Sequence, residues 1–331
     1  MDCLQRPTSA RWGALAIFAL ASFASAGCLR QGPAVGAEPV ESASVQTEST
    51  AADSDAYFGE PPVGLEPYLF APGVLSLDDR YEYGIAVSRD GREIFFGVDT
   101  GQRAEIRFSE FSDGRWSPDR PLIPGAAFSF NDPFLSEDEK RLYFISDAVV
   151  DGEGRKQDHD IWYVERTAEG WSNPIHGGAV LNTEFDEYFV SLTDEGTLYF
   201  GSNRPADSAS GEAAGFDLYA APSASDGFAP AKRLPAALNT EHYEADVFVA
   251  PDESYVIFCS IRPEGLGRGD LYISFRQPDG DWSPAKSMGD QINTDGHELC
   301  PFVSRDGRFF FYTCNEDIYW VDAKLLESYR E

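Results

Sequence analysis

Four glutamates that recur at matching places along the chain are the first candidates for chemistry. In three of them the acid follows the Asn of an Asn-Thr pair by five residues, and a related acid lies in an earlier copy. In chain order they are Glu82, Glu187, Glu244 and Glu298. Carboxylates that converge on one face would attract a cation or a basic partner, and Ca²⁺ takes oxygen ligands of this kind. The sequence therefore predicts an acidic binding face, with Ca²⁺ as the single cofactor to consider.

The same glutamates also have a structural explanation. Arg204 in a Ser-Asn-Arg string and Arg262 in a Ser-Ile-Arg string occupy matching places in two copies. Unpaired like charges near one axis would raise their pKa values and cost stability, so pairing with an arginine or with the residue's own loop is the favoured interpretation. Arg204 and Arg262 are therefore candidate site residues together with the glutamates.

Two histidines follow the repeated Asn residues and are predicted to lie on the same face: His242 and His297. The chain has four His in all, too few for a His-rich metal site, and no metal-ligating set is predicted. The nucleophile elbow, the zinc-protease helix motif and the phosphate-binding loop are missing from the sequence. No residue is therefore assigned a catalytic role.

A repeated sequence unit must position these residues. Five segments share an apolar strand, an Asp-centred turn and an aliphatic-aromatic strand. Short β-branched and aromatic runs, bounded by Gly, Asp, Asn and Pro, predict about four strands per unit. The turn acids recur roughly 50 to 60 residues apart, at Asp90, Asp138, Asp194, Asp252 and Asp306. This is the pattern of a β-propeller blade, since single blades must stack around an axis to bury both sheet faces.

The predicted fold is an all-β propeller of five four-stranded blades in a single domain over residues 63–331. The fifth copy ends after its third strand, and residues 67–75 lie just before the first copy, where an outer strand belongs. We predict that this N-terminal strand completes the last blade and closes the ring. Six blades would need a degenerate unit within residues 55–75. Long Gly-rich loops at 147–159, 202–216 and 260–269 would emerge on the face of the glutamates, where recognition usually resides.

These units resemble the WD-like propeller repeats of bacterial envelope proteins, which are related to the propeller domain of TolB. The resemblance covers about residues 80–326. The segments that carry it are Ser260–Tyr272, Asp279–Trp282, Asn293–Glu298 and Phe302–Gly307. The family implies an exported interaction scaffold. Because the domain that precedes the TolB propeller has no counterpart in this sequence, a TolB-like role in translocation is not expected.

The N-terminal segment indicates export. Arg6 and Arg11 precede the apolar run 14–23, which is too short to span a membrane and is typical of a secretory signal over residues 1–27. A Cys directly after Ser-Ala-Gly resembles the lipoprotein signal, so Cys28 is the predicted lipidation site, with an ordinary secretory signal as the alternative. Residues 28–62 lack aliphatic clusters and are predicted to form a flexible acidic tether. The protein would then be periplasmic or associated with the outer membrane through its lipid anchor alone.

Charge excludes further classes. With 26 Lys and Arg against 56 Asp and Glu, a net charge of −30 argues against nucleic acid as a partner. Cys300 and Cys314 flank a predicted hairpin turn, and their pairing in a disulfide is left open.

Taken together, the sequence predicts a monomeric, non-enzymatic, exported binding or scaffold protein that recognises a protein or glycan of the cell envelope. The alternative is a five-bladed glycosidase that uses two carboxylates near the central channel.

Overall fold

Strands make up nearly all regular structure in the computed structural model, which describes residues 56–150, 155–205 and 215–330. Its helices in these ranges are two short 3₁₀ turns, η1 (Tyr57–Gly59) and η2 (Ala323–Tyr329). No helix there has the length and apolar character needed to cross a membrane. The predicted signal, Cys28 and most of the predicted tether lie outside the described residues.

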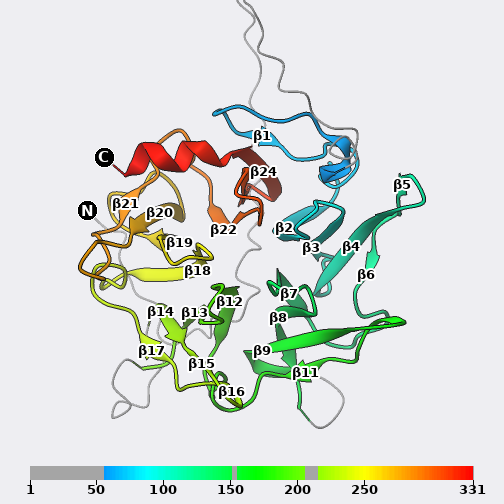
Figure 1. Ribbon diagram of the computed structural model, residues 1–331, viewed down its shortest axis with the longest axis horizontal. Helices are drawn as coiled ribbons and strands as arrows, with labels where there is room; N and C mark the ends of the chain where they lie inside the picture. The colour runs from blue at the N-terminus through cyan, green and yellow to red at the C-terminus, as the bar shows by residue number, and fades with distance from the viewer. Residues whose placement is uncertain (1–55, 151–154, 206–214, 331) are drawn as a thin grey trace, which may run out of the picture. The chain divides into compact units, whose positions relative to one another are not determined.

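The strands form five antiparallel sheets arranged around one axis, as the sequence repeat predicts (Figure 1). In each sheet four strands follow one another from the axis outward, and the innermost strands are β2, β7, β12, β18 and β22. The prediction of five blades is confirmed.

The strands of each blade follow one another from the innermost to the outermost. Blade 1 comprises β2 (Tyr81–Val87), β3 (Glu93–Asp99), β4 (Ala104–Ser112) and β6 (Arg120–Pro121), and blade 2 comprises β7 (Phe130–Leu135), β8 (Arg141–Ala148), β9 (Arg155–Thr167) and β11 (Ile175–His176). Blade 3 comprises β12 (Glu187–Leu192), β13 (Leu198–Ser202), β14 (Asp217–Ala221) and β17 (Lys232–Arg233), and blade 4 comprises β18 (Tyr243–Val249), β19 (Tyr255–Ile261), β20 (Asp270–Phe275) and β21 (Lys286–Ser287). Blade 5 comprises β22 (Glu298–Val303), β23 (Phe309–Cys314), β24 (Asp317–Asp322) and β1 (Tyr68–Leu69). Short extra strands extend three blades as β5 (Arg115–Trp116), β10 (Gly170–Trp171) and the pair β15 (Ser223–Ala224) and β16 (Gly227–Phe228).

The ring closes through an N-terminal strand, which confirms the predicted closure. Strand β1 pairs antiparallel with β24, with Tyr68 opposite Trp320. The outermost strand of the last blade therefore comes from the start of the domain, so the N-terminal and C-terminal parts of the propeller are joined by backbone hydrogen bonds.

The described part of the predicted tether joins this closure. Tyr57 is buried, and its ring lies 4.9 Å from that of Phe309 in blade 5. Its amide donates a 2.8 Å hydrogen bond to the carbonyl of Gly91 in blade 1. A Cβ at Gly91 would lie 2.8 Å from the Tyr57 ring, so glycine is needed at that turn. The residues packed on the propeller thus begin by Tyr57, before the predicted domain start at residue 63.

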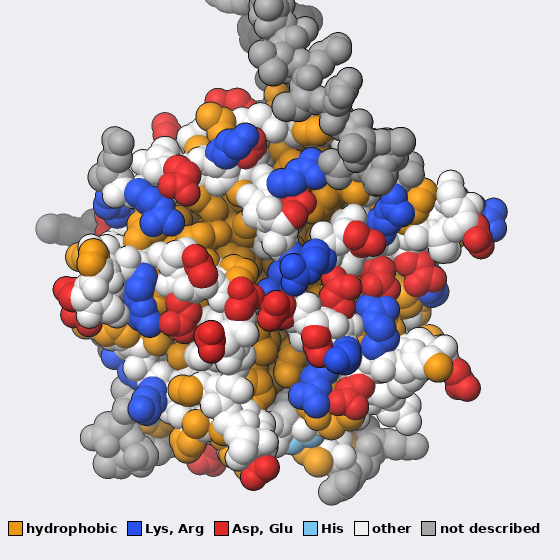
Figure 2. Space-filling model, in the orientation of Figure 1, with side chains coloured by type: hydrophobic (Ala, Val, Ile, Leu, Met, Phe, Trp, Pro, Cys, Tyr) orange, Lys and Arg blue, Asp and Glu red, His pale blue; other side chains and the backbone are white. Residues whose placement is uncertain are grey.

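Aromatic side chains seal neighbouring blades. The ring of Trp171 in blade 2 lies 5.8 Å from Phe95 in blade 1, in an edge-to-face arrangement. Cys259, Cys300 and Cys314 are all free thiols and buried, so Cys300 and Cys314 are not bridged. Figure 2 shows one face of the molecule, on which acidic and basic side chains alternate without a continuous patch of either sign.

Candidate functional site

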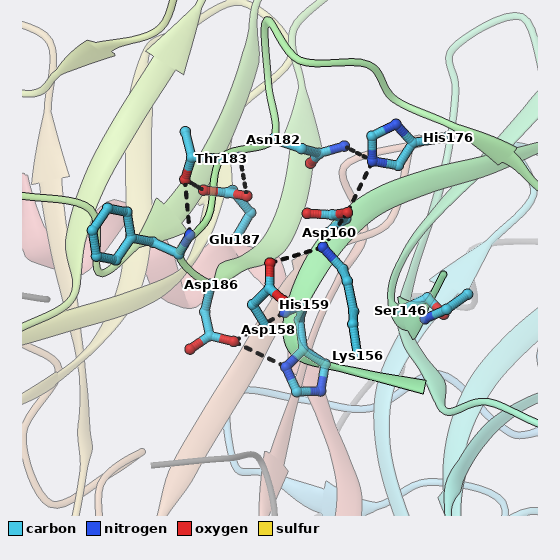
Figure 3. A network of polar contacts seen from close by, with 12 residues as sticks. Ser146, Lys156, Asp158, His159, Asp160, His176, Asn182, Thr183, Asp186 and Glu187 are labelled. Carbon is cyan, nitrogen blue, oxygen red and sulfur yellow. Dashed lines mark hydrogen bonds and ion pairs between the residues drawn. The ribbon is translucent and has the colours of Figure 1, made fainter. Parts of the chain in front are cut away.

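The repeated glutamates lie at the innermost strands, but the described contacts of each side chain stay within its own blade. Glu187 is fully buried and accepts hydrogen bonds from the Thr183 amide at 3.0 Å and the Thr183 hydroxyl at 2.7 Å. The Ser202 hydroxyl at 3.1 Å and the Arg204 guanidinium at 2.8 Å complete its contacts. Figure 3 shows the Thr183 contacts beside a second network around His159 and Asp186. Burial raises the pKa of Glu187, and the Arg204 charge opposes that rise.

The other three glutamates follow the same plan with local changes. Glu244 accepts from both donor groups of Thr240 and pairs with Arg262 at 3.5 Å. Glu298 accepts from both donor groups of Thr294 and from the Cys314 thiol.

Blade 1 lacks the Asn-Thr opener, and Arg80 takes its place beside Glu82. Burial raises the pKa of Glu82 to about 7, although Arg80 opposes the shift. Among the described contacts none joins one of the four glutamates to another. These are the contacts that the structural interpretation predicts.

The two predicted histidines have different surroundings. His297 packs under the loop before β20, with Nε2 4.0 Å from the Cys259 sulfur. Burial, together with a smaller effect of the Arg268 charge, lowers the pKa of His297 to about 4, so the ring is neutral at pH 7. His242 is half-buried, and its amide donates to the Thr240 hydroxyl.

A different set of residues meets at the propeller axis. Every innermost strand carries a β-bulge, and its bulged residue has a positive φ between 52° and 54°. The bulged residues are Gly84, Asp132, Phe189, Asp246 and Cys300. Each comes from a different blade, and each lies two residues after the position that holds the glutamate in four of the five blades.

Contacts between blades join these bulged residues. The Cys300 amide lies 3.4 Å from Asp246 Oδ2, and its thiol donates to Asp132 Oδ1 at 3.7 Å. A Cβ on Gly84 would lie 3.3 Å from Asp132 Oδ1 and 3.7 Å from the Cys300 sulfur. Phe189 and Cys300 belong to one small apolar cluster. We call Asp132, Asp246 and Cys300 the axial cluster.

Tyrosines surround the axial cluster toward the loop-rich face. Tyr81, Tyr83, Tyr188 and Tyr243 are each partly exposed and lie on the innermost strands ahead of the bulges. Burial raises the pKa of all four, and the Asp132 carboxyl adds to the rise in each case. The tyrosines therefore stay protonated at neutral pH and present hydroxyl groups and ring faces.

An arc of four aromatic rings runs across blades 2, 3 and 4 on this face. His159 lies 5.0 Å from Tyr188, Tyr188 lies 5.5 Å from Phe216, and Phe216 lies 5.4 Å from Tyr243, between ring centroids. His159 Nδ1 is 3.0 Å from Asp186 Oδ1 (Figure 3). It is also 3.0 Å from the Tyr188 hydroxyl. We call these four rings the aromatic arc. Its members come from strands and loops of three blades, so the propeller itself fixes their spacing.

Below the axial cluster the interior is apolar. Phe302 lies two residues after Cys300, and its ring centroid is 6.5 Å from that of Phe134 and 5.9 Å from that of Phe248. All three rings are buried and come from different blades. Beyond them Arg305 donates to the Leu135 carbonyl and pairs with Asp194, which ties blade 5 to blades 2 and 3 at the turn face. Along the innermost part of blade 5, the buried Phe302 thus lies between Cys300 of the axial cluster and Arg305 at the turn.

A surface hollow of about 520 Å³ in blade 1 is a second place to consider. Its arginines are already paired, since Arg107 bonds Glu105 and Asp119 while Arg80 bonds Glu82 and Asp119. Burial alone would raise the pKa of Asp119, but Arg107 and Arg80 outweigh it and lower that pKa. The hollow is therefore a closed ion network and not an open anion site.

Within the described ranges, no group of three or more His, Cys, Asp or Glu side chains is arranged to hold a metal ion. The Ca²⁺ prediction stays a prediction.

Sequence reasoning missed the axial cluster and the aromatic arc. The signal that could have found part of the axial cluster is the position two residues after the repeated glutamate, which holds Asp246 and Cys300 in two of the copies. It holds residues of different chemistry in the five copies, where the rest of the unit repeats.

Solved structures of low sequence identity share the fold. A thermostable family-43 glycoside hydrolase is 12% identical, with a TM-score of 0.51 over 77% of this chain and 91% of its own. TolB from Acinetobacter baumannii is 14% identical, with a TM-score of 0.46 over 73% of this chain. This chain spans 54% of the TolB chain, about half its length. No family model matches the chain, and no curated protein has a significantly similar sequence.

Proposed function

We propose that the chain is a non-enzymatic, exported binding protein that recognises a protein or glycan of the cell envelope through its loop-rich face. The observation that carries the proposal is the aromatic arc beside the axial cluster, because three of its four rings, Tyr188, Phe216 and Tyr243, are partly exposed and lie on one side of the five-bladed scaffold. Tyrosine and phenylalanine rings of this kind dominate the energetics of protein and glycan recognition. Glu187 and Glu244, with Arg204 and Arg262, then act by fixing the loops of blades 3 and 4, which carry three of the four rings. Glu82 and Glu298 have the same local role in blades 1 and 5.

The spacing at the axis favours binding over hydrolysis. A glycosidase needs two carboxyl groups that flank a sugar bond, with room for the sugar and in some cases a water between them. In this propeller Cys300 stands between Asp132 and Asp246, with its thiol near one carboxyl and its amide near the other. That place is filled by protein, so the pair does not flank an open site.

The binding proposal is tested with two aromatic substitutions on the arc. Phe216→Ala combined with Tyr243→Ala should lower recovery of envelope material in a pull-down at least about tenfold, since central aromatic anchors contribute about 2 kcal/mol or more. Arg89→Ala, an exposed change on the turn face, is the matched control and should leave recovery unchanged.

Equal recovery by the folded double variant and the wild type would remove the arc from the proposal. Release of sugars from bacterial or plant polysaccharides by the purified wild type would instead support the glycosidase alternative.

A lipid anchor at Cys28 would place this binding face at a membrane of the envelope. Metabolic labelling with a fatty acid should mark the wild type and the Cys3→Ala control, because Cys3 lies within the predicted signal. Cys28→Ala should carry no label. Label that persists in Cys28→Ala would contradict the anchor and leave an ordinary secretory signal.

A further inference from the structure

Two carboxyl groups contact Cys300 at the axis, one through its thiol and the other through its amide. Asp132 is 5% exposed, and its side chain contacts the Asn131 amide and the Cys300 thiol. Asp246 is half-buried and accepts from the Cys300 amide. Among the contacts described for residues 56–150, 155–205 and 215–330, no Lys, Arg or His side chain bonds or pairs with either carboxyl. Glu187 and Glu244, which are fully buried, each have an arginine.

Two ionised carboxylates in this position would be costly. Each would lose much of its hydration, and each would repel the other in a medium where charges are poorly screened. A pair of acids in this situation holds one proton in common, which removes most of the repulsion. Burial raises the pKa of Asp132, and the Asp246 charge raises it further, while burial also raises the pKa of Asp246.

We infer that at neutral pH the pair of Asp132 and Asp246 holds one proton, so that only one of the two carboxyls is charged, and that this reduced charge keeps the axial ends of blades 2, 4 and 5 together around Cys300. Loss of the proton at alkaline pH leaves two adjacent negative charges around Cys300. The repulsion then loosens the bulges that carry the axial cluster. This effect on the stability of the ring does not depend on the proposed binding partner.

The other ionisable groups that face the pair stay neutral through the relevant pH range. They come from β2, β12, β18, β19 and β22, and burial raises the pKa of every one of them. These groups are Tyr81, Tyr83, Tyr188, Tyr243, Cys259 and Cys300. None of them supplies a positive charge, so the proton itself is what balances the pair.

The direction of the pH effect follows from the raised pKa values. Above about pH 5 the unfolded chain has released the protons of both aspartates, while the folded protein at neutral pH still holds one. Folding therefore takes up protons from solution, and the contribution of the pair to stability falls as the pH rises through neutral. It reaches its lowest level once the folded pair has lost its last proton.

The experiment compares urea unfolding of the wild type and Asp132→Asn from pH 5 to pH 9. Asn keeps the shape of the side chain and removes its charge. The urea midpoint of the variant, relative to that of the wild type, should therefore increase as the pH rises. Asp226→Asn, an exposed change in the turn between β15 and β16, is the control and should follow the wild type at every pH.

A carboxyl NMR titration of aspartate-labelled wild-type protein gives a second readout that does not depend on the variant folding. Two aspartate signals should titrate above the ordinary carboxyl range, and those of Asp132 and Asp246 should be assigned by their loss in the Asn variants. A midpoint difference between wild type and Asp132→Asn that is constant from pH 5 to pH 9 would overturn the inference. Titration of both carboxyls below pH 5 would overturn it as well.

Discussion

Glu187→Ala should lower the free energy of unfolding by about 3 to 5 kcal/mol, the usual cost of removing one partner of a buried ion pair. The substitution takes away the acceptor for Thr183, Ser202 and the Arg204 guanidinium. Arg204 has a side chain only 15% exposed and would be left as a buried, unpaired charge. The melting temperature, measured by circular dichroism, should fall by about 10 °C.

A matched acid on the surface separates this effect from loss of charge alone. Glu165 pairs with Arg141 and is 44% exposed, so Glu165→Ala should change stability by less than about 1 kcal/mol. Glu187→Gln keeps one acceptor oxygen, so its loss in free energy of unfolding should lie between those of Glu187→Ala and Glu165→Ala. Equal melting temperatures for Glu187→Ala and Glu165→Ala would contradict the structural role of Glu187. That result would favour a role of Glu187 in binding.

Tyr57→Ala should destabilise the propeller by about 3 kcal/mol, because it removes a large buried ring from the closure. The ring packs against Phe309 and lies 6.2 Å from Trp320, and its hydroxyl donates to Asp306 at 3.3 Å. These contacts join the N-terminal segment to blade 5. The change is measured as a lower urea midpoint in equilibrium unfolding.

Tyr68 is the control for this substitution. It lies on the closing strand β1, but its side chain is 57% exposed, so Tyr68→Ala should shift the midpoint much less. If both variants unfold at the same midpoint, the segment around Tyr57 does not contribute to closure.

The blades could be predicted from sequence because their signals are local. A strand, an Asp-centred turn and a second strand lie within about 20 residues, and the unit recurs five times. Closure by residues 67–75 followed from the missing outer strand of the last copy. The predicted start of the domain at residue 63 is too late. Tyr57 and Phe58 are isolated aromatic residues in a polar segment, so composition alone does not indicate that they pack on the propeller. Their packing depends on Phe309 and Trp116, far along the chain.

The candidate site was harder to predict because it depends on contacts between blades. The recurrence of the glutamates predicted a binding face, but the glutamates recur because each forms local hydrogen bonds or ion pairs, mostly with Thr and Arg. The axial cluster draws one residue from each of three blades, and Asp132 and Cys300 are 168 residues apart. The position two residues after the repeated glutamate marks Asp246 and Cys300 but not Asp132, because blade 2 has Phe130 where the other blades have the glutamate. The bulge that turns them to the axis is a backbone feature that Gly84 signals in only one copy.

Recognition at the aromatic arc on the loop-rich face can be tested in cells by photo-cross-linking. The photoreactive residue p-benzoylphenylalanine is placed either at Phe216 in the arc or at Arg89 on the turn face. We predict cross-linked envelope adducts from the position of Phe216 and none from that of Arg89. Adducts from the Arg89 position alone, or in equal amount from both, would contradict recognition by the arc.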